Sequence, residues 1–553
     1  MARRCAGVGL LLSGCPGGGN EDDSTGPMVT TTTSGPTSTT TEGEGSTMPS
    51  DTTSGTCPEG TLGCPCSPGN TCSGALECQA GTCRDPGGES STGPDDTTTT
   101  SGPAACDNGI PDAGDLCLGS ASPVAMGAGT IAVTVANFDN DPALDLVAAN
   151  RDANTISIRL GVGDGTFGVQ TPIMVGTGPV AVGHGDFNGD GNLDVVTVNV
   201  GSVDLTMMPG DGNGDFGAAV AVGLGVMLTP TDLAVEDLEG DGDPDVLLTE
   251  STMSLIHVLR TDAGAFLPAT TFAVGGGPSA VFTDDFSGDG VPDAITANAT
   301  GNSVSLLLGN GFGQLGGAST GDAGVGPSDV STGDFNGDGE TDVIVANPGG
   351  DVTIRLGNGL GGLGVDAGFG VGGSPVSLSV GDFNGDANLD VVLANGGALT
   401  LLSGNGGGLF GAPANTAVLG TTSALLVVDV NGDGHLDALL TSVDANLVTV
   451  LLGNGVGGFG GGVPFATGPQ PVALAAGDLS GDGVLDLAVV NQGDGTVSVL
   501  EGNGAGSFAA VATVATGPAP TGVGLGDINE DGALDIMVTS ETGDSVGLLV
   551  TDP

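Results

Sequence analysis

The stretch Gly185-Asp-Phe-Asn-Gly-Asp-Gly-Asn-Leu-Asp194 decides the fold of this chain. Acidic loops of the same form, Asp-x-Asn-Gly-Asp-Gly-x-x-Asp, occur nine times, at steps of 47 to 51 residues. They begin at Asn137, Asp186, Asp237, Asp285, Asp334, Asp382, Asp429, Asp478 and Asp527, and they are called loops 1 to 9 below, each with positions 1 to 9. A motif at such a period indicates a repeat architecture in which each repeat is one supersecondary unit.

The segments around each loop predict strands. Residues 180–185 alternate in character before loop 2, and the apolar run 195–198 follows it, which reads as strand, loop, strand. A third run, such as 155–160, leads through a glycine-rich turn such as 452–460 to a fourth short strand such as 217–222. Four strands in about 48 residues match one propeller blade, so the predicted fold class is all-β, a β-propeller of four-stranded blades.

The ends of the array predict how the ring closes. The last repeat stops at residues 551–553, after its third strand, whereas residues 118–127 resemble a fourth strand. An N-terminal strand that completes the C-terminal blade would remove two exposed sheet edges. Nine blades exceed the usual four to eight, and two smaller rings are the alternative. Because no linker interrupts the repeats, we expect one closed ring.

Each loop carries the oxygen ligands that a hard cation prefers. Calcium takes six to eight oxygens, and alternate residues of a tightly curled loop can all point inward, with the backbone carbonyl used at position 7. Solvated turns that bind nothing are the alternative, but they would not explain the recurrence of carboxylates at positions 1, 5 and 9. The predicted calcium ligands are Asn137, Asp139, Asp141, Asp145, Asp186, Asn188, Asp190, Asn192, Asp194, Asp237, Glu239, Asp241, Asp243, Asp245, Asp285, Ser287, Asp289, Val291, Asp293, Asp334, Asn336, Asp338, Glu340, Asp342, Asp382, Asn384, Asp386, Asn388, Asp390, Asp429, Asn431, Asp433, His435, Asp437, Asp478, Ser480, Asp482, Val484, Asp486, Asp527, Asn529, Asp531, Ala533 and Asp535.

The loops are predicted to bind unequally. Position 6 needs a positive φ, which glycine adopts easily and proline cannot. Loop 1 has Asn137 at position 1 and Pro142 at position 6, so it should bind weakest. Ala387 in loop 6 is a smaller defect, and Ser287 and Ser480 replace asparagine at position 3.

The repeats resemble those of FG-GAP and VCBS proteins, whose blades include those of the integrin α-subunit head. The resemblance rests on Gly185–Gly191 with its eight relatives and on Phe410-Gly-Ala-Pro413, and it covers residues 116–553. It implies calcium-binding loops and a propeller used as an interaction surface. EF-hand and dockerin loops share the acidic pattern but do not repeat at this period without helices between them.

The net charge of the chain limits which partners it can bind. The chain has 66 acidic residues against 7 basic ones and a formal charge of −59, which bound calcium would reduce by two per ion. Such a chain repels nucleic acid and anionic lipid, so neither is an expected partner. Without the ions each loop would hold three like charges, so folding and calcium binding should be coupled.

The N-terminal part predicts an exported protein. Residues 1–15, with two arginines, a short apolar run and Cys15, resemble a bacterial lipoprotein signal with lipidation at Cys15, although an ordinary secretory signal is the alternative. The expected location is the outer membrane or cell surface, or the medium. Residues 16–56 and 85–105 are Thr/Ser/Gly/Pro-rich and predict disordered linkers.

Cysteines define two further segments. Residues 57–84 hold six of them and little apolar core, which predicts a small disulfide-rich module, with zinc as a rival that the absence of Cys-x-x-Cys pairs disfavours. Residues 106–117, bounded by Cys106 and Cys117, resemble short cysteine-rich repeats of exported myxobacterial proteins, which implies a short disulfide loop before the propeller of residues 118–553.

Two function classes remain. The first is a non-catalytic interaction or adhesion protein that binds an extracellular protein or polysaccharide and reaches the membrane only through its lipid anchor. The second is a propeller enzyme or carbohydrate-binding protein. The absence of Trp and Tyr disfavours sugar stacking, and the three histidines, His184, His257 and His435, look structural. We therefore expect the first class, with no enzyme activity.

Overall fold

The computed structural model describes residues 77–79, 82–84, 117–118, 122–225, 229–262, 264–364, 367–540 and 544–552. The two short strands β1 (Glu77–Gln79) and β2 (Thr82–Arg84) belong to a unit separate from the repeats. They pair antiparallel, so that the backbone of residue 78 lies opposite that of residue 83. The predicted signal, both linkers and the other residues of the cysteine-rich module lie outside the described residues.

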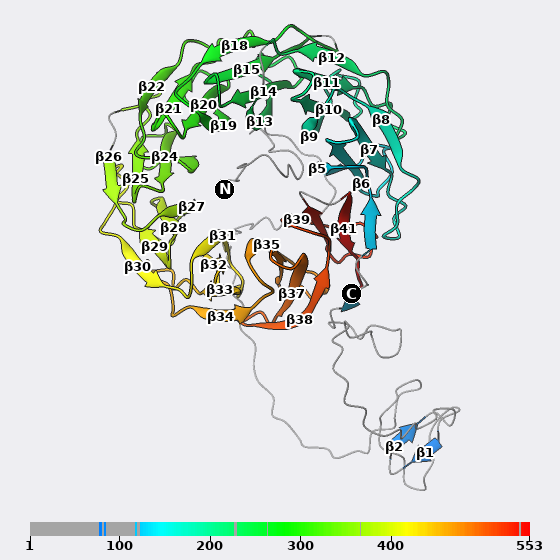
Figure 1. The fold of residues 1–553 in the computed structure, drawn as a ribbon. Helices are drawn as coiled ribbons and strands as arrows, with labels where there is room; N and C mark the ends of the chain where they lie inside the picture. The colour runs from blue at the N-terminus through cyan, green and yellow to red at the C-terminus, as the bar shows by residue number, and fades with distance from the viewer. Residues whose placement is uncertain are drawn as a thin grey trace, which may run out of the picture. The chain divides into compact units, whose positions relative to one another are not determined.

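The repeats form nine four-stranded antiparallel sheets arranged in one ring, which confirms the predicted propeller (Figure 1). The innermost strands are β5 (Thr130–Ala136), β9 (Pro179–Gly185), β13 (Pro230–Glu236), β19 (Pro278–Asp284), β23 (Asp329–Gly333), β27 (Pro375–Gly381), β31 (Thr422–Val428), β35 (Pro471–Gly477) and β39 (Pro520–Gly526). The second strands are β6 (Asp145–Asn150), β10 (Asp194–Asn199), β14 (Asp245–Glu250), β20 (Asp293–Asn298), β24 (Asp342–Asn347), β28 (Asp390–Asn395), β32 (Asp437–Ser442), β36 (Asp486–Asn491) and β40 (Asp535–Ser540).

The outer half of each blade is built in the same order. The third strands are β7 (Thr155–Arg159), β11 (Asp204–Met208), β15 (Leu255–Leu259), β21 (Ser303–Leu307), β25 (Asp351–Arg355), β29 (Ala398–Leu402), β33 (Leu447–Leu451), β37 (Thr496–Gly502) and β41 (Ser545–Leu549). The outermost strands are β8 (Thr171–Met174), β12 (Val220–Gly223), β18 (Thr270–Ala273), β22 (Ser319–Asp322), β26 (Ala367–Gly370), β30 (Ala414–Ala417), β34 (Val463–Ala466), β38 (Phe508–Ala515) and β4 (Ser122–Ala125). Blades are numbered 1 to 9 from β5 onward, and blade n carries loop n between its first two strands.

The second strand of every blade is buried along its whole length, which explains its nearly continuous apolar sequence. All six residues of β10 are buried, and the same holds for its counterparts in the other blades. The apolar clusters lie between neighbouring blades: one joins Val196 and Leu205 of blade 2 to Leu233 and Val246 of blade 3. Each blade therefore buries its apolar faces only when both neighbours are present.

The ring closes as predicted. β4, from the start of the repeat region, pairs antiparallel with β41 and completes the sheet order β39-β40-β41-β4. A second pair joins β3 (Cys117–Leu118) to β42 (Thr551–Asp552). One apolar cluster joins Met126 and Leu146 to Met537 and Leu548, across the junction between blades 9 and 1. The alternative of two smaller rings is wrong.

Individual blades differ in their turns. In blade 3 the turn after the third strand forms a small hairpin of β16 (Thr261–Asp262) and β17 (Ala265–Phe266), where six other blades have a single bridge, as between Gly161 and Phe167. The fourth strand of blade 2, expected over residues 217–222, begins later and spans Val220–Gly223, because the glycine-rich turn extends to Gly217, whose N–H donates to the Pro209 carbonyl at 2.7 Å.

Candidate metal-binding loops and the face that carries them

Loops 1 to 9 and the glycine-rich turns lie at the same end of the sheets. Each loop connects the first strand of a blade to the second, and each glycine-rich turn connects the third strand to the fourth. In an antiparallel sheet, the connection between strands 1 and 2 and the connection between strands 3 and 4 lie at the same end of the strands. All predicted loop ligands are within the described residues, whereas Cys15 is not.

The oxygens at positions 1, 3 and 5 point into the loop. In loop 5 the Asp334 carboxylate accepts hydrogen bonds from the backbone N–H groups of Gly337, Asp338 and Gly339, at 2.7, 3.2 and 2.9 Å. Asn336 Oδ1 accepts from the Asp338 N–H at 2.8 Å, and Asp338 Oδ1 accepts from the Glu340 N–H at 3.0 Å. The alternating spacing therefore curls the backbone around its own side-chain oxygens, as predicted.

Position 6 distinguishes the loops. Gly191 in loop 2 has φ 86°, and Ala387 in loop 6 takes φ 67°, a left-handed conformation that strains a residue with a Cβ. Pro142 in loop 1 has no N–H to donate and is not among the positive-φ residues. There the Asn137 side-chain amide donates to the Asp141 carbonyl instead. Loop 1 thus has its own geometry, as expected, while its weaker calcium binding stays a prediction.

The aspartate at position 9 has a structural role that the sequence reasoning missed. Asp342 is fully buried; its Oδ2 accepts from the Phe335 N–H at 2.9 Å and its Oδ1 from the Gly357 N–H at 2.7 Å. It thereby joins position 2 of the loop to the first residue of the glycine-rich turn. The N–H at the equivalent place is bonded in this way in every blade, and in blade 9, which has no such turn, it belongs to Thr551 of β42. A glycine or threonine 14 to 16 residues after each position-9 aspartate was the signal in the sequence.

Burial raises the pKa of these carboxyl groups, because desolvation penalises the charged form. Neighbouring carboxylates add to the shift, as Asp338 and Asp334 do for Asp342, and the backbone donors oppose it. The pKa is raised to about 6 at Asp145, Asp194, Asp293, Asp342, Asp486 and Asp535, and it is also raised at Asp245, Asp390 and Asp437. Each loop therefore holds a buried acid next to exposed acids that repel it.

Loop 3 departs from the others at position 3. The Glu239 carboxylate forms an ion pair with Arg260 at 3.3 Å, and Arg260 also donates to the Phe312 carbonyl of blade 4 at 2.8 Å. This arginine supplies part of the positive charge that a cation would bring, so Glu239 is a weaker candidate ligand than its counterparts.

The loops also contact the next blade around the ring. The Phe335 carbonyl in loop 5 accepts from the Gly408 N–H in the turn of blade 6 at 3.0 Å. The Phe335 ring packs on Phe410 with centroids 5.8 Å apart, and the same contact joins Phe187 to Phe266 at 5.6 Å. The loops are thus part of the joints between blades, and the phenylalanine of the Phe-Gly-Ala-Pro motif is a packing residue.

Two of the three histidines lie inside this packing. His184 Nδ1 is 2.6 Å from the Thr134 hydroxyl of blade 1, and burial lowers the pKa of His184 to about 4. His257 is fully buried within blade 3. Its two ring nitrogens have no hydrogen-bond partner among the described residues, and burial lowers its pKa. His435, at position 7 of loop 7, is exposed and borders Gly455 of the turn in its own blade.

The donor set of the loops suits a hard cation, although the side chains are not gathered around one point. Within the described residues, no three His, Cys, Asp or Glu side chains converge as a metal centre. The donors are nearly all oxygens, and Oδ2 of Asp194 and Oδ2 of Asp293 are buried without a hydrogen-bond partner. Positions 1, 3, 5 and 9 are therefore the residues that could hold calcium.

Comparison with known proteins gives one family. The FG-GAP-like repeat matches residues 137–197, 186–248, 285–345, 334–393, 382–440, 429–489 and 478–538. No curated protein gives a significant match.

Several solved structures are similar to this chain at low sequence identity. A biofilm matrix protein of V. cholerae is 13% identical, with 78% of this chain and 88% of that chain covered and a TM-score of 0.40. An Agrocybe aegerita protein that recognises non-reducing terminal N-acetylglucosamine is 18% identical, with 63% and 90% covered and a TM-score of 0.36. A putative 6-phosphogluconolactonase from Bacteroides fragilis is 14% identical, with 61% and 95% covered and a TM-score of 0.38. Similarity at this level does not establish a shared function.

Proposed function

Because this chain belongs to the FG-GAP-like repeat family of β-propeller proteins, we propose that it is a non-catalytic, calcium-stabilised interaction or adhesion protein of the cell surface. Its partner would be an extracellular protein or polysaccharide. The observation that carries the calcium part is the buried aspartate at position 9, whose pKa is raised by burial and by the loop carboxylates next to it.

The loop residues would have distinct parts in a calcium site. Positions 1 and 5 supply carboxylates at the exposed side, position 3 supplies an amide, hydroxyl or carboxylate oxygen, and position 9 supplies a carboxylate from the buried side. Bound calcium would offset the repulsion among these groups. The aspartate at position 9 also accepts a hydrogen bond from the glycine-rich turn. An ion that keeps this aspartate charged would therefore also stabilise the turn. In this way ion binding at one loop would stabilise the joint between two blades.

The expected energy is large because the sites are many. Extracellular calcium sites often have dissociation constants of about 0.1 to 1 mM. A tenfold excess of calcium over that constant stabilises the folded protein by roughly 1.4 kcal/mol per site. Nine independent sites would contribute up to about 13 kcal/mol, comparable to the stability of a whole domain.

Thermal unfolding with and without calcium tests this proposal. Chelation should lower the melting temperature sharply and make residues 118–553 sensitive to protease, and magnesium should restore little because it prefers a smaller, more rigid octahedral shell. A melting curve that is the same in calcium and in chelator would leave the loops as solvated turns and refute the calcium part.

The surface role rests on composition and on the N-terminal pattern. A charge of −59 disfavours nucleic acid and anionic lipid as partners, and the Thr-rich segments would present the propeller on a flexible stalk. Within the described residues the structure contains no helix long and apolar enough to cross a membrane. The pattern of residues 1–15 supports attachment through a lipid on Cys15, in an exported outer-membrane or cell-surface protein.

Fractionation tests the anchor separately from the propeller. A Cys15→Ser variant should leave the membrane fraction while its propeller melts as before. Retention in the membrane would show that another anchor holds the protein. Pull-downs from outer-membrane extract, with and without calcium, then identify the partner; a set of bound proteins or polysaccharides that is the same without the propeller would contradict the interaction role.

A further inference from the structure

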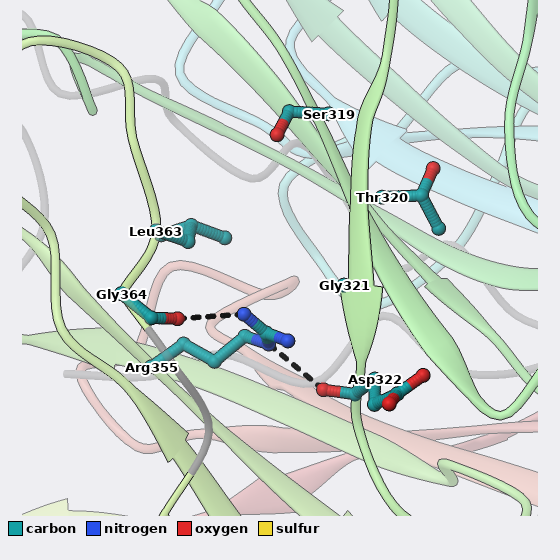
Figure 2. Close-up of a pocket in the computed structure, with 7 residues that line it drawn as sticks. All are labelled: Ser319, Thr320, Gly321, Asp322, Arg355, Leu363 and Gly364. Carbon is teal, nitrogen blue, oxygen red and sulfur yellow. Dashed lines mark hydrogen bonds between the residues drawn. The ribbon is translucent and has the colours of Figure 1, made fainter.

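A pocket of about 410 Å³ lies on the outer side of the ring, where blades 4 and 5 meet (Figure 2). Its wall on the blade 4 side is the outermost strand β22, with Ser319, Thr320, Gly321 and Asp322. On the blade 5 side it is lined by Arg355, at the end of β25, and by Leu363 and Gly364 in the turn that follows. None of these residues belongs to an acidic loop, although the turn begins at Gly357, whose N–H donates to Asp342 of loop 5.

Arg355 is a buried cation that forms no ion pair with any carboxylate of the described residues, and the Asp322 carboxylate lies on the other side of β22 from it (Figure 2). The Arg355 residue is only 7% exposed. Its Nε donates to the Asp322 carbonyl at 2.8 Å and its Nη1 donates to the Gly364 carbonyl at 2.7 Å. Nη2 has no hydrogen-bond partner among the described residues. Taking a charge out of water is costly unless an opposite charge or a full set of hydrogen bonds compensates.

Blade 1 carries the same arginine with all three of its guanidinium nitrogens bonded. Arg159, at the end of β7, donates through Nε and Nη2 to the carbonyl of Ala125, the last residue of β4, and through Nη1 to Gly168. The corresponding carbonyls in blades 4 and 5 are those of Asp322 and Gly364, so both arginines join neighbouring blades. Only in blade 1 are all three guanidinium nitrogens used. The contact that Arg355 makes between blades 4 and 5 therefore does not explain why its Nη2 has no partner among the described residues.

Gly321 leaves room for the guanidinium group of Arg355. Gly321 precedes Asp322 in β22 as Val124 precedes Ala125 in β4, and Val124 packs in the apolar cluster between blades 9 and 1. A Cβ placed on Gly321 would lie 2.3 Å from Cζ of Arg355. Glycine therefore lets the guanidinium lie against the strand. Figure 2 shows it between the Gly364 carbonyl and β22, on the side of the strand where Ser319 lies.

We propose that this pocket binds a carboxylate group of a sugar acid, with Arg355 as the charged contact. A guanidinium edge is planar and matches the two oxygens of a carboxylate. The Ser319 hydroxyl offers a further hydrogen bond, and Leu363 offers an apolar wall for the ring. The volume lies in the range of small-ligand sites. A uronic acid unit in an otherwise neutral extracellular polysaccharide has this chemistry, whereas the charge of −59 would repel a polymer that is acidic throughout. The inference deepens the proposed interaction function, because it names the class of partner that this part of the ring would recognise.

Binding of glucuronate to the full chain in saturating calcium tests the site, with glucose as the neutral control. Titration calorimetry or ligand-observed NMR should give a dissociation constant on the order of 1 mM for glucuronate and no measurable binding of glucose. Gly321→Val, which copies blade 1 and keeps the arginine, should abolish binding. Arg355→Gln should weaken it about tenfold or more. Arg159→Gln removes the same kind of contact between blades where all three guanidinium nitrogens are already bonded, and it should leave binding unchanged.

Absence of glucuronate binding by the unaltered protein would overturn the proposal, as would equal binding of glucose or full binding by Gly321→Val. Melting curves of each variant in calcium separate loss of the site from loss of the fold. They also separate this inference from the proposed function: if chelation leaves the melting curve unchanged while glucuronate still binds, the calcium part fails and the pocket stands.

Discussion

At the residue scale, the loops combine two kinds of aspartate. Those at positions 1 and 5 accept hydrogen bonds from the backbone of their own loop, as Asp334 and Asp338 do. The aspartate at position 9 is buried, and it accepts hydrogen bonds both from position 2 of its own loop and from the glycine-rich turn that follows the third strand. Substitutions at these positions should therefore differ in kind: the first removes a ligand, and the second also loosens a turn.

Asp338→Ala should remove calcium from one loop only. The bound calcium should fall by one ion per chain, and the loss of about 1.4 kcal/mol at tenfold excess should lower the melting temperature by about 1–2 °C in so large a ring. Asp152→Ala is the matched control, because Asp152 is an exposed aspartate outside the loops, with 67% of its side chain accessible. Equal effects of the two substitutions on bound calcium, measured by mass spectrometry under native conditions, would exclude position 5 as a ligand.

His257 should make blade 3 sensitive to acid. Six other blades have serine or threonine at this position, paired with an asparagine at the end of the second strand, as Asn298 pairs with Ser305 at 3.0 Å. Blade 3 has Glu250 and His257 instead. The pKa of His257 is lowered by burial, so its contribution to stability is present above the unfolded value of about 6.5 and is lost as pH falls below it, on the order of 1 kcal/mol per pH unit.

The double variant Glu250→Asn, His257→Thr restores the pair found in the other blades. In saturating calcium, its melting temperature should fall less between pH 7 and pH 5 than that of the unaltered protein. Parallel pH profiles of the two proteins would show that His257 does not titrate during unfolding.

At the scale of the element, each hairpin of first and second strands depends on the charge of its loop. Without metal the carboxyl at position 9 has a pKa of about 6 in six blades, above its unfolded value of about 3.9. A raised folded pKa stabilises the fold fully below the unfolded pKa, and this contribution is lost as pH rises through about 6. The hairpins should thus be weakest, without calcium, at neutral pH.

Metal-free protein should accordingly melt at a higher temperature at pH 5 than at pH 7, with His184 and His257 opposing the trend only in part. Calcium should flatten or reverse this profile, because it stabilises the ionised carboxylates. The measurement is calorimetry on protein freed of metal by chelating resin, with calcium added back at each pH. A metal-free melting temperature that falls between pH 7 and pH 5 would contradict the raised pKa at position 9.

At the scale of the whole molecule, the ring depends on a strand from the far end of the repeat region. β4 supplies the outer edge of blade 9, and Val124 and Met126 pack in the apolar cluster at that junction. Every other blade obtains its four strands from one continuous repeat. Closure is therefore the step that couples the first and last repeats.

A chain that begins at residue 126 should be less stable than one that begins at residue 106 by several kcal/mol. It loses the four backbone pairs of β4 and the burial of Val124. The chain from residue 106 keeps β3 and β4 and should melt like the full chain. If both shortened chains melt alike in calcium, closure by β4 contributes nothing measurable to stability.

The sequence determined the repeat, its four strands, the acidic loops and the strand that closes the ring. These features follow from local periodicity, from turn residues and from a pattern repeated nine times, all of which act over fewer than about 50 residues. The inward curl of the loops at Asp334 and the different geometry at Pro142 were predictable for the same reason.

Only the tertiary structure determined which residues of neighbouring strands and blades are in contact. It placed the position-9 aspartates on the glycine-rich turns, packed Phe335 edge to face against Phe410, paired Glu239 with Arg260 and left Arg355 beside Gly321 with a donor that no described residue uses. Most of these partners belong to different strands or different repeats, and their side chains meet only when the sheets pack around the ring. A sequence pattern states what each repeat contains, whereas packing around a closed ring determines which residues of neighbouring repeats come into contact.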